Sequence, residues 1–319
     1  MIKVKKKMRI GIIGLGKMGL NHLNVLGALN SVDIVFLNDI RNQKLNLGEY
    51  SKFLKHISFV PNLKIDAIII ATPTSTHFNI IEKVGKYVKN IFIEKPLAQN
   101  FKETKKIISY AKNKKINLKT GFIERFNPAI ISLKQIIKKN DKKIFFNFMR
   151  ASPVSDRIKD VDVVTDLMVH DIDLSIFFNG KVKKIKSYGY KKNNMIAHAN
   201  VILTHANGVM TNLLASRITQ KKIRHINVTL DKKYIVCDLL RKELDVFTNT
   251  VIKNVNNKFN YKSISETIET GHKEPLLIEL QAFIDSCNGI KSKFLSDGAD
   301  SHEVMRVCEK IRNEIEYTN

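Results

Sequence analysis

Several residue types are scarce in this sequence of 319 residues, which has no Trp, three Cys and 14 Gly. Cys237, Cys287 and Cys308 are too few and too far apart for a disulfide framework, and no CxxC pair indicates a zinc site. No apolar stretch approaches the roughly 18 residues of a membrane-spanning helix. The apolar run after the basic N-terminus leads to no small-residue cleavage site, so we expect no signal peptide. These absences exclude a disulfide-rich secreted scaffold and favour a soluble, cytoplasmic protein without a metal site.

Acidic residues are also scarce. Lys and Arg number 54 against 30 Asp and Glu, so the formal net charge is +24. Such an excess is compatible with nucleic acid, an anionic membrane or acidic ligands as partners. However, the lysines are scattered along the chain, whereas a nucleic-acid surface usually gathers them into one stripe. We therefore interpret the excess as compositional drift and predict neither a nucleic-acid nor a membrane partner.

The first 120 residues or so alternate strand and helix patterns. Short apolar runs predict strands at Met8–Ile13, Val32–Leu37, Ala67–Ala71, Asn90–Ile93 and Leu118–Phe122. Apolar residues at helical spacing predict helices at Lys17–Leu29, Thr76–Lys89 and Phe101–Asn113. This alternation indicates βαβ units, so we expect an α/β fold whose residues 1–122 form a doubly wound parallel sheet of the Rossmann type.

After Phe122 the pattern changes, and residues 123–319 are expected to form an α+β domain. Helical spacing predicts helices at Pro128–Lys139, Val164–Phe178, Glu274–Cys287 and about Ala299–Glu316. Alternating segments predict strands at Val182–Tyr190, Met195–Thr204, Val209–Ser216, Ile223–Leu230, Tyr234–Leu239 and Leu244–Thr248. Hairpin turn signals favour a mostly antiparallel open sheet. Lys253–Ser263 is expected to be polar and mobile. The last helix is expected to belong to this second domain or to pack back on the first.

A glycine-rich loop joins the first predicted strand to the first predicted helix. It runs Gly14-Leu15-Gly16-Lys17-Met18-Gly19. In a GxGxxG loop at this position the glycines allow a tight turn, approach of a pyrophosphate and close helix packing. Asp39 ends the second strand roughly 20 residues further on, where a carboxylate binds the adenosine ribose of NAD. Arg41 is near enough to hold a 2′-phosphate, so NADP stays open.

Polar residues follow the strand predicted at Ala67–Ala71. Ligands of parallel sheets bind beyond the carboxyl ends of the strands. Ala71, Thr72 and His77 are therefore candidate cofactor contacts. Thr76 is equally a candidate helix N-cap, and His77 is better interpreted as a polar first-turn residue than as a catalyst.

A second strand ends in the motif Glu94-Lys95-Pro96. A surface ion pair is the simplest interpretation. Nevertheless Lys95 is expected to face the crevice of the glycine loop, where an ammonium group can hydrogen-bond a substrate hydroxyl and stabilise an alkoxide. Partial desolvation would lower its pKa and allow acid–base work. We interpret Glu94 as a cofactor contact and Lys95 as a catalytic and substrate-binding group.

The predicted helix at Val164–Phe178 carries polar residues on an apolar background. Asp166, His170 and Asp173 stand at i, i+4 and i+7, which places them on one helical face. A polar stripe on a buried helix is costly unless it is hydrogen-bonded or functional. A satisfied core histidine is the alternative, but two carboxylates beside His170 favour catalysis, with Asp166 orienting the imidazole.

Together and in this order, these motifs resemble those of the Gfo/Idh/MocA oxidoreductases over essentially the whole chain. The resemblance implies NAD(P)-dependent hydride transfer at a sugar or cyclitol carbinol. It also implies an open sheet in the second domain that builds a homodimer or homotetramer. Lys95, Asp166 and His170 match the catalytic trio of the family, in which the Lys-Pro bond is often cis. Which of Lys95 and His170 takes the proton stays open.

Finer matches resemble the subfamily that oxidises the 3-hydroxyl of UDP-N-acetylglucosamine for amino sugars of surface glycans or lipid A. They lie in Gly121–Pro128, Arg150–Pro153 and Asp166–Leu174. A diphosphate needs cations, and arginine matches phosphate geometry. The candidate substrate contacts are Lys95, Arg125, Asn127, Arg150, Arg157 and Asp173. Surface solvation is the alternative for each arginine. Alternative functions are a free-sugar or inositol dehydrogenase, or a non-catalytic cofactor-binding regulator.

Overall fold

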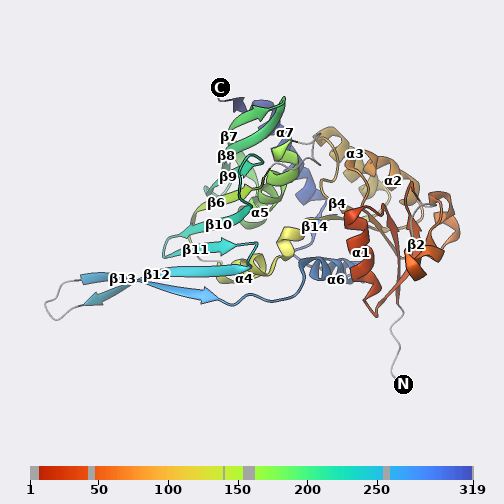
Figure 1. Cartoon of the computed structure of the whole chain (residues 1–319), viewed down its shortest axis with the longest axis horizontal. Coiled ribbons are helices and arrows are strands. Elements are labelled where there is room, and N and C mark those ends of the chain that lie inside the picture. The colour runs from red at the N-terminus through yellow and green to blue at the C-terminus, as the bar shows by residue number, and fades with distance from the viewer. Residues whose placement is uncertain (1–6, 42–46, 139–140, 154–161, 254–258, 318–319) are drawn as a thin grey trace, which may run out of the picture. The chain divides into compact units, whose positions relative to one another are not determined.

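The computed structural model describes residues 7–41, 47–138, 141–153, 162–253 and 259–317, with side chains described outside 250–262. The chain forms two compact units, which Figure 1 shows in ribbon form. One comprises residues 1–123 and 274–305, and the other residues 124–273 and 306–319. None of the helices in the described ranges is both long and apolar enough to cross a membrane.

The first unit is built on a six-stranded sheet of order β14-β5-β4-β3-β1-β2. Its strands are β1 (Met8–Ile13), β2 (Val32–Asn38), β3 (Ala67–Ile70), β4 (Asn90–Glu94), β5 (Asn117–Gly121) and β14 (Ser296–Asp297). Strands β1 to β5 are parallel, and the two-residue β14 pairs antiparallel with β5. Because β1 lies between β2 and β3, the sheet is doubly wound. The Rossmann-type fold predicted for this part of the chain is confirmed.

Helices bury the apolar strands of this sheet. They are α1 (Lys17–Gly27), α2 (His77–Val84), α3 (Phe101–Asn113), α6 (Pro275–Cys287) and the first part of α7 (Gly298–Glu314). Helices α2 and α3 pack together and bury Ile81, Val84 and Ile107 in one core with Ile70 and Ile93 of the sheet. Helix α1 packs against α6. This cover explains why the strands read as continuous apolar runs rather than as an alternation.

The second unit contains a nine-stranded sheet of order β13-β12-β11-β10-β6-β9-β8-β7-β15. Its strands are β6 (Lys143–Ala151), β7 (Val182–Lys192), β8 (Met195–His205), β9 (Met210–Ser216), β10 (Ile223–Leu230), β11 (Lys233–Asp238), β12 (Glu243–Lys253), β13 (Phe259–Ile268) and β15 (Glu316–Tyr317). The pairs β6–β9 and β7–β15 are parallel and the other pairs are antiparallel. The predicted mostly antiparallel sheet is therefore confirmed.

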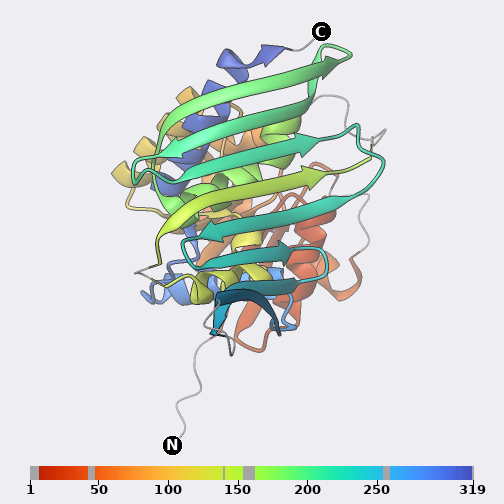
Figure 2. The ribbon, with the colours of Figure 1, turned by 90° about the vertical axis from the view of Figure 1, so that its left-hand side faces the viewer.

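One face of this sheet is covered by helices α4 (Pro128–Ile136) and α5 (Val169–Asn179). Residues such as Phe146 and Phe148 of β6 are fully buried on this face. Figure 2 shows the strands of the sheet side by side from its other face. There Ile202, Met210 and Tyr234 are exposed. The sheet is thus open on one side.

The structure corrects two sequence-based assignments in this unit. Strand β6 was not predicted, because Phe145 and Met149 on its less buried face are as apolar as the buried Phe146 and Phe148, which weakens the alternation. The segment Lys253–Ser263 was expected to be polar and mobile. Instead β12 continues to Lys253 and β13 begins at Phe259, and their residues pair in register; residues 254–258 lie outside the described part of the chain.

The predicted helix at Val164–Phe178 is also not regular. A π-helical turn occupies Val164–Met168, and α5 follows from Val169. Because a π turn holds more residues than an α turn, the i, i+4, i+7 rule does not carry through it. Asp173 is buried, whereas Asp166 and His170 are half-buried. The regular helical spacing used to place Asp166 on one face with His170 and Asp173 therefore does not hold, whereas His170 and Asp173 both lie within α5.

Candidate functional site

The glycine loop has the backbone that a bound dinucleotide requires. Gly14 has a φ of +90°, and a Cβ on it would lie 2.6 Å from the carbonyl oxygen of Ala71. A Cβ on Gly19 would collide with the carbonyl oxygen of Gly14, so α1 can start close to β1 only with glycine there. Gly16, by contrast, faces open space. The loop thus leaves room where a pyrophosphate would approach the helix N-terminus.

Lys17 and Met18 form the first turn of α1 directly after this loop. Lys17 is exposed and Met18 is half-buried. The unsatisfied N–H groups of a first helical turn attract anions, and an exposed ammonium group adds to that field. Both residues therefore lie where the sequence predicted cofactor contacts.

Asp39 and Arg41 are brought together beside the loop. The carboxylate of Asp39 accepts a hydrogen bond from the backbone N–H of Leu15 at 2.7 Å and another from Nε of Arg41 at 2.8 Å. The hydrogen bond from Arg41 is the largest of the effects that lower the pKa of Asp39 to about 2. Asp39 is therefore an ionised acceptor next to the glycine loop, as a contact to a ribose hydroxyl requires, and it shares its oxygens with Arg41.

The segment after β3 does not place all its polar groups on a ligand surface. Ala71 and Thr72 are half-buried at the strand end. His77 is fully buried, and its ring nitrogens lie 3.0 and 3.2 Å from the carbonyl oxygens of Thr72 and Leu97. Burial lowers the pKa of His77. The predicted cofactor contact by His77 is therefore wrong, because its imidazole is enclosed by the chain itself.

Thr76 precedes α2 but does not cap it with its side chain. Its hydroxyl donates instead to the carbonyl oxygen of Pro73 at 2.7 Å. The N-cap interpretation of Thr76 is therefore not supported.

The Glu94-Lys95-Pro96 motif stands at the end of β4, and its Lys95–Pro96 peptide bond is cis, as the family resemblance implied. Glu94 is held from two sides. Its Oε1 lies 2.7 Å from Nε2 of His22, and its Oε2 accepts the backbone N–H of Lys95 at 3.2 Å. Lys95 itself is half-buried. Glu94 is therefore held by the fold, through His22 and the backbone of Lys95.

The sequence analysis did not single out His22, although its position in the helical pattern could have indicated a special role. His22 is fully buried on α1 together with Gly19, Leu23 and Leu26, in the phase of the apolar face. A histidine in an apolar phase needs a polar partner. That partner, Glu94, is 72 residues away in the chain.

In the second unit the π-helical turn presents Asp166 to an arginine. Oδ2 of Asp166 lies 2.5 Å from Nη2 of Arg217, which directly follows β9. His170 is half-buried one turn further along α5. The predicted catalytic carboxylate is thus restrained by a cation that the sequence analysis overlooked. Arg217 could have been singled out from the sequence, because it directly follows the strand predicted at Val209–Ser216.

Two arginines predicted to bind the diphosphate are core residues instead. Arg125 is 1% exposed and makes a bidentate ion pair with Asp173, with Nε–Oδ2 and Nη2–Oδ1 distances of 2.8 and 2.6 Å. Arg150 is 2% exposed and binds Asp171 at 2.7 Å and Glu124 at 2.9 Å. A guanidinium that is almost fully buried and ion-paired in this way has no face for a phosphate. The substrate contacts expected from Arg125, Arg150 and Asp173 are therefore wrong.

Asn127 is also used by the fold. Its side chain accepts the backbone N–H of Ala129 at the start of α4 and donates to the carbonyl oxygen of Leu239 at 3.0 Å. It is 6% exposed. The predicted substrate contact by Asn127 is thus not supported, while Arg157 lies outside the described residues.

Arg224 is a further arginine that the sequence analysis missed. It lies on β10 opposite Arg150 of β6, and its Nη1 is 3.1 Å from Oε1 of Glu124. Its side chain is 34% exposed. Arg224 lies on the same face of β10 as the buried Ile226 and Val228. An arginine in line with buried apolar residues is unusual, and the sequence pattern could have indicated it as a candidate functional residue.

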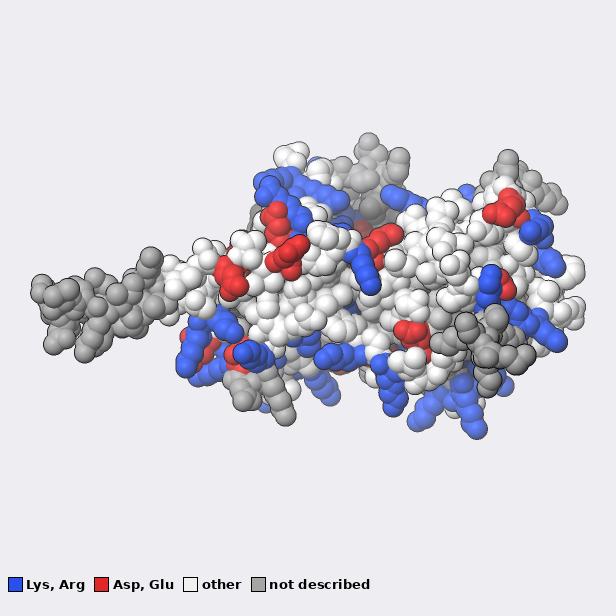
Figure 3. All heavy atoms as spheres, turned by 90° about the horizontal axis from the view of Figure 1, so that it is seen from below, with Lys and Arg blue, Asp and Glu red and all other residues white. Residues whose placement is uncertain are grey.

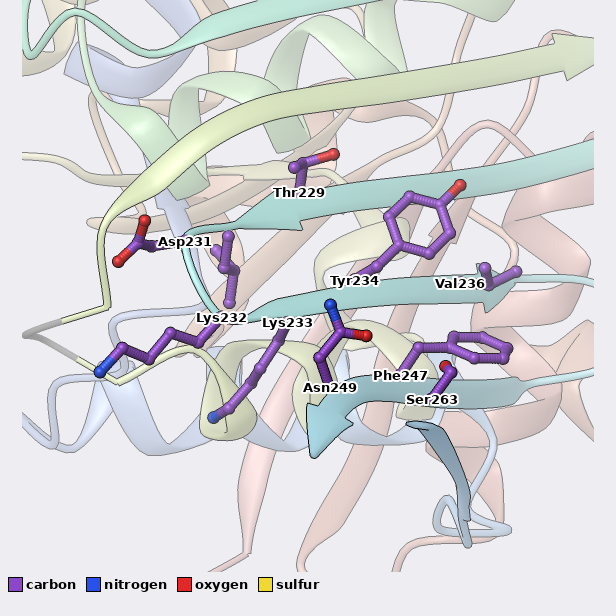
Figure 4. A pocket seen from close by; sticks show the side chains of 10 residues that line it. Thr229, Asp231, Lys232, Lys233, Tyr234, Val236, Phe247, Asn249 and Ser263 are labelled. Carbon is purple, nitrogen blue, oxygen red and sulfur yellow. The ribbon is translucent and has the colours of Figure 1, made fainter. Parts of the chain in front are cut away.

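A separate cavity of about 700 Å³ lies on strands β10 to β13 (Figure 4). Its lining includes Tyr234 and Phe247, whose ring centroids are 6.2 Å apart, Lys232 of the turn between β10 and β11, and Lys233 at the start of β11. None of the predicted site residues lines this cavity. Figure 3 shows Lys and Arg spread over the visible face with Asp and Glu among them, rather than in one stripe.

The fold and the glycine loop define a dinucleotide-binding α/β protein with a second, sheet-bearing unit. Residues 8–122 match the model of the Gfo/Idh/MocA oxidoreductase family, described as an NAD-binding Rossmann fold. Residues 8–122 of the chain thus form an NAD-binding domain of this oxidoreductase family.

Several relatives of the chain are named as dehydrogenases. UDP-N-acetylglucosamine 3-dehydrogenase of Acidithiobacillus ferrooxidans is 26% identical over 97% of each chain. A solved structure of that enzyme covers 97% of this chain and 98% of its own, with a TM-score of 0.85 at 24% identity. The NAD⁺-dependent scyllo-inositol 2-dehydrogenase of Bacillus subtilis is 28% identical over 60% of each chain.

Proposed function

We propose that this protein uses NAD to oxidise the 3-hydroxyl of UDP-N-acetylglucosamine, giving the 3-keto nucleotide sugar for amino sugars of surface glycans or lipid A. The observation that carries the proposal is the fraction of the chain over which its sequence is similar to that of each named relative. The UDP-N-acetylglucosamine 3-dehydrogenase matches 97% of the chain, including the second unit, whereas the inositol dehydrogenase of Bacillus subtilis matches 60%. Substrate recognition depends on the site rather than on the shared cofactor fold.

The proposed chemistry uses three side chains. NAD, when bound, supplies the hydride acceptor. His170 accepts the hydroxyl proton, and Lys95 donates a hydrogen bond to the oxygen as negative charge develops there. Asp166, restrained by Arg217, orients His170. General acid–base help of this kind contributes roughly 10²–10⁴-fold.

The residues of the first unit fit NAD. The loop faces open space at Gly16, where a pyrophosphate would approach, and the ionised Asp39 offers an acceptor for the ribose. We propose NAD as the preferred cofactor. NADP is the alternative, because Arg41 beside Asp39 could bind a 2′-phosphate.

A panel of substrates tests the proposal. UDP-N-acetylglucosamine, myo-inositol and glucose are each offered with NAD or NADP, and reduced nicotinamide is followed by absorbance. We expect turnover with UDP-N-acetylglucosamine and NAD. Turnover with myo-inositol alone would replace the proposal with the inositol dehydrogenase alternative, which the 28% identity to the Bacillus subtilis enzyme supports.

The roles of the side chains are tested separately. In His170→Ala, turnover should fall roughly 10²-fold or more, while NAD affinity measured by calorimetry stays at the wild-type value. Replacing Arg241, a 74% exposed residue of the second unit, with Ala supplies the control. Full turnover in His170→Ala would remove His170 from the mechanism.

We also propose a cytoplasmic homodimer or homotetramer that does not bind nucleic acid. The open sheet face of the second unit supports the assembly, since it exposes Tyr188, Ile202, Met210 and Tyr234. Light scattering during size-exclusion chromatography tests the assembly, and a monomer at micromolar concentration would contradict it. Duplex DNA binding at physiological salt would contradict the assignment of partners.

A further inference from the structure

A nucleotide sugar carries a diphosphate, and the two arginines first assigned to it are unavailable. Arg125 and Arg150 are 1% and 2% exposed and are already ion-paired with buried carboxylates. If the proposed substrate is correct, another cation of the second unit must meet its charge, and that cation must reach solvent while staying ordered.

Arg224 combines both properties. Its side chain is 34% exposed, and a single nitrogen, Nη1, is held by Oε1 of Glu124 at 3.1 Å. Among the described residues, no second carboxylate forms an ion pair with it. The guanidinium group carries several N–H donors in a planar fork. Glu124 therefore anchors one edge of the fork and leaves donors for a ligand.

Glu124 is itself a firm anchor. It is 7% exposed and binds Nη1 of the buried Arg150 at 2.9 Å as well as Arg224. Burial opposes its charged form, but Arg150 and Arg224 hold the pKa of Glu124 below its ordinary value. The carboxylate thus stays ionised and restrains Arg224, so little entropy is lost when the guanidinium group takes a second partner.

Arg224 also lies at the end of the sheet where the proposed catalytic Asp166 is bound. Strand β6 ends at Ala151, which pairs with Ser216 at the end of β9 and with Ile223 at the start of β10. Arg217, the residue after Ser216, binds the proposed catalytic Asp166. Arg224, the residue after Ile223, therefore stands at the same edge of the unit as Asp166.

Arg224 lies in a partly buried cluster with Arg150 and Glu124. Burial and the neighbouring charge of Arg150 lower the pKa of Arg224, and the nearby carboxylates, Glu124 and Asp166 among them, only partly offset this. A phosphate oxygen could bind the remaining donors of the fork in the geometry that arginine and phosphate share.

We propose that Arg224 binds a phosphate oxygen of the substrate diphosphate, with Glu124 as its positioning residue. The inference rests on the proposed function, because it names the group that recognises the nucleotide part of that substrate. It also assigns the role first expected of Arg125 and Arg150 to a residue that the fold leaves accessible.

Calorimetric binding of UDP and of uridine to the full-length protein tests the inference. Arg224→Ala should weaken UDP binding about 10- to 100-fold, the range of a charge-assisted hydrogen bond. Uridine binding should stay unchanged, because uridine has no phosphate. Arg224→Lys keeps the charge but lacks the planar fork of donors. Its UDP affinity should therefore lie between those of wild type and Arg224→Ala.

The control is Arg241→Ala, which removes the same charge from a 74% exposed position of the second unit. It should leave UDP binding within about twofold of wild type, as expected for a solvated surface charge. If wild type binds UDP and Arg224→Ala binds it equally well, the inference is overturned and the proposed function stands. If wild type binds no UDP at millimolar concentration, the nucleotide-sugar substrate itself is overturned. Equal loss of uridine and UDP in Arg224→Ala would indicate a structural role and also overturn the inference.

Discussion

Replacing Arg125 with Met is expected to lower the free energy of unfolding of the second unit by about 3–5 kcal/mol. The change removes two hydrogen bonds of 2.8 and 2.6 Å from a carboxylate, Asp173, that is 1% exposed. Breaking a buried pair costs this much because the remaining charge stays in a poorly solvating interior. The guanidinium also lies 4.9 Å from the ring of Phe177, and that contact is lost too. Urea unfolding followed by circular dichroism measures the loss.

The double variant Arg125→Met/Asp173→Leu isolates the cause. It removes both charges and fills the site with apolar groups, which is often neutral for a buried pair. We expect most of the stability to return, and the Michaelis constant for the nucleotide sugar to match that of wild type. A loss below about 1 kcal/mol in the single variant, together with a raised Michaelis constant in the double variant, would refute a structural role and restore Arg125 as a substrate contact.

Three further outcomes follow from the first unit. His22→Leu removes the donor to Glu94 and should cost about 1.5–3 kcal/mol in urea unfolding, whereas His22→Gln, whose amide can reach the carboxylate, should recover at least half. Because the pKa of Asp39 is lowered to about 2, its contribution to stability is present above pH ~4 and is lost toward pH 2; the melting temperatures of wild type and Asp39→Asn should converge over that range, and a constant difference would contradict the assignment. Gly121→Ala places a Cβ 2.9 Å from the ring of Phe92 and should cost about 1–3 kcal/mol, so an unchanged thermal midpoint would argue against this packing.

The fold of the first unit could be predicted from the sequence because its signals are local. The glycine loop, its flanking strand and helix, and Asp39 all lie within one βαβ segment. Each demands particular residue types at a fixed spacing. Strand β6 was missed for the opposite reason: both of its faces are partly apolar, so residues such as Phe145 and Phe146 show no alternation.

The candidate site was predicted less well, because an arginine pattern does not reveal its counterion. Arg125 meets Asp173 from 48 residues away, and Arg150 meets Asp171 from 21 residues away. Whether such a cation serves a ligand or the core is decided by tertiary packing. His77 shows the same limit, since its enclosure depends on the carbonyl group of Leu97 beyond β4.

The π-helical turn at Val164–Met168 has a consequence for comparing this chain with its relatives. One surplus residue in a helix rotates everything that follows by about 100° around the axis. A relative with an uninterrupted helix should therefore be one residue shorter between the counterparts of Val163 and His170. An alignment that forbids a gap there would match Asp166 to a side chain pointing elsewhere.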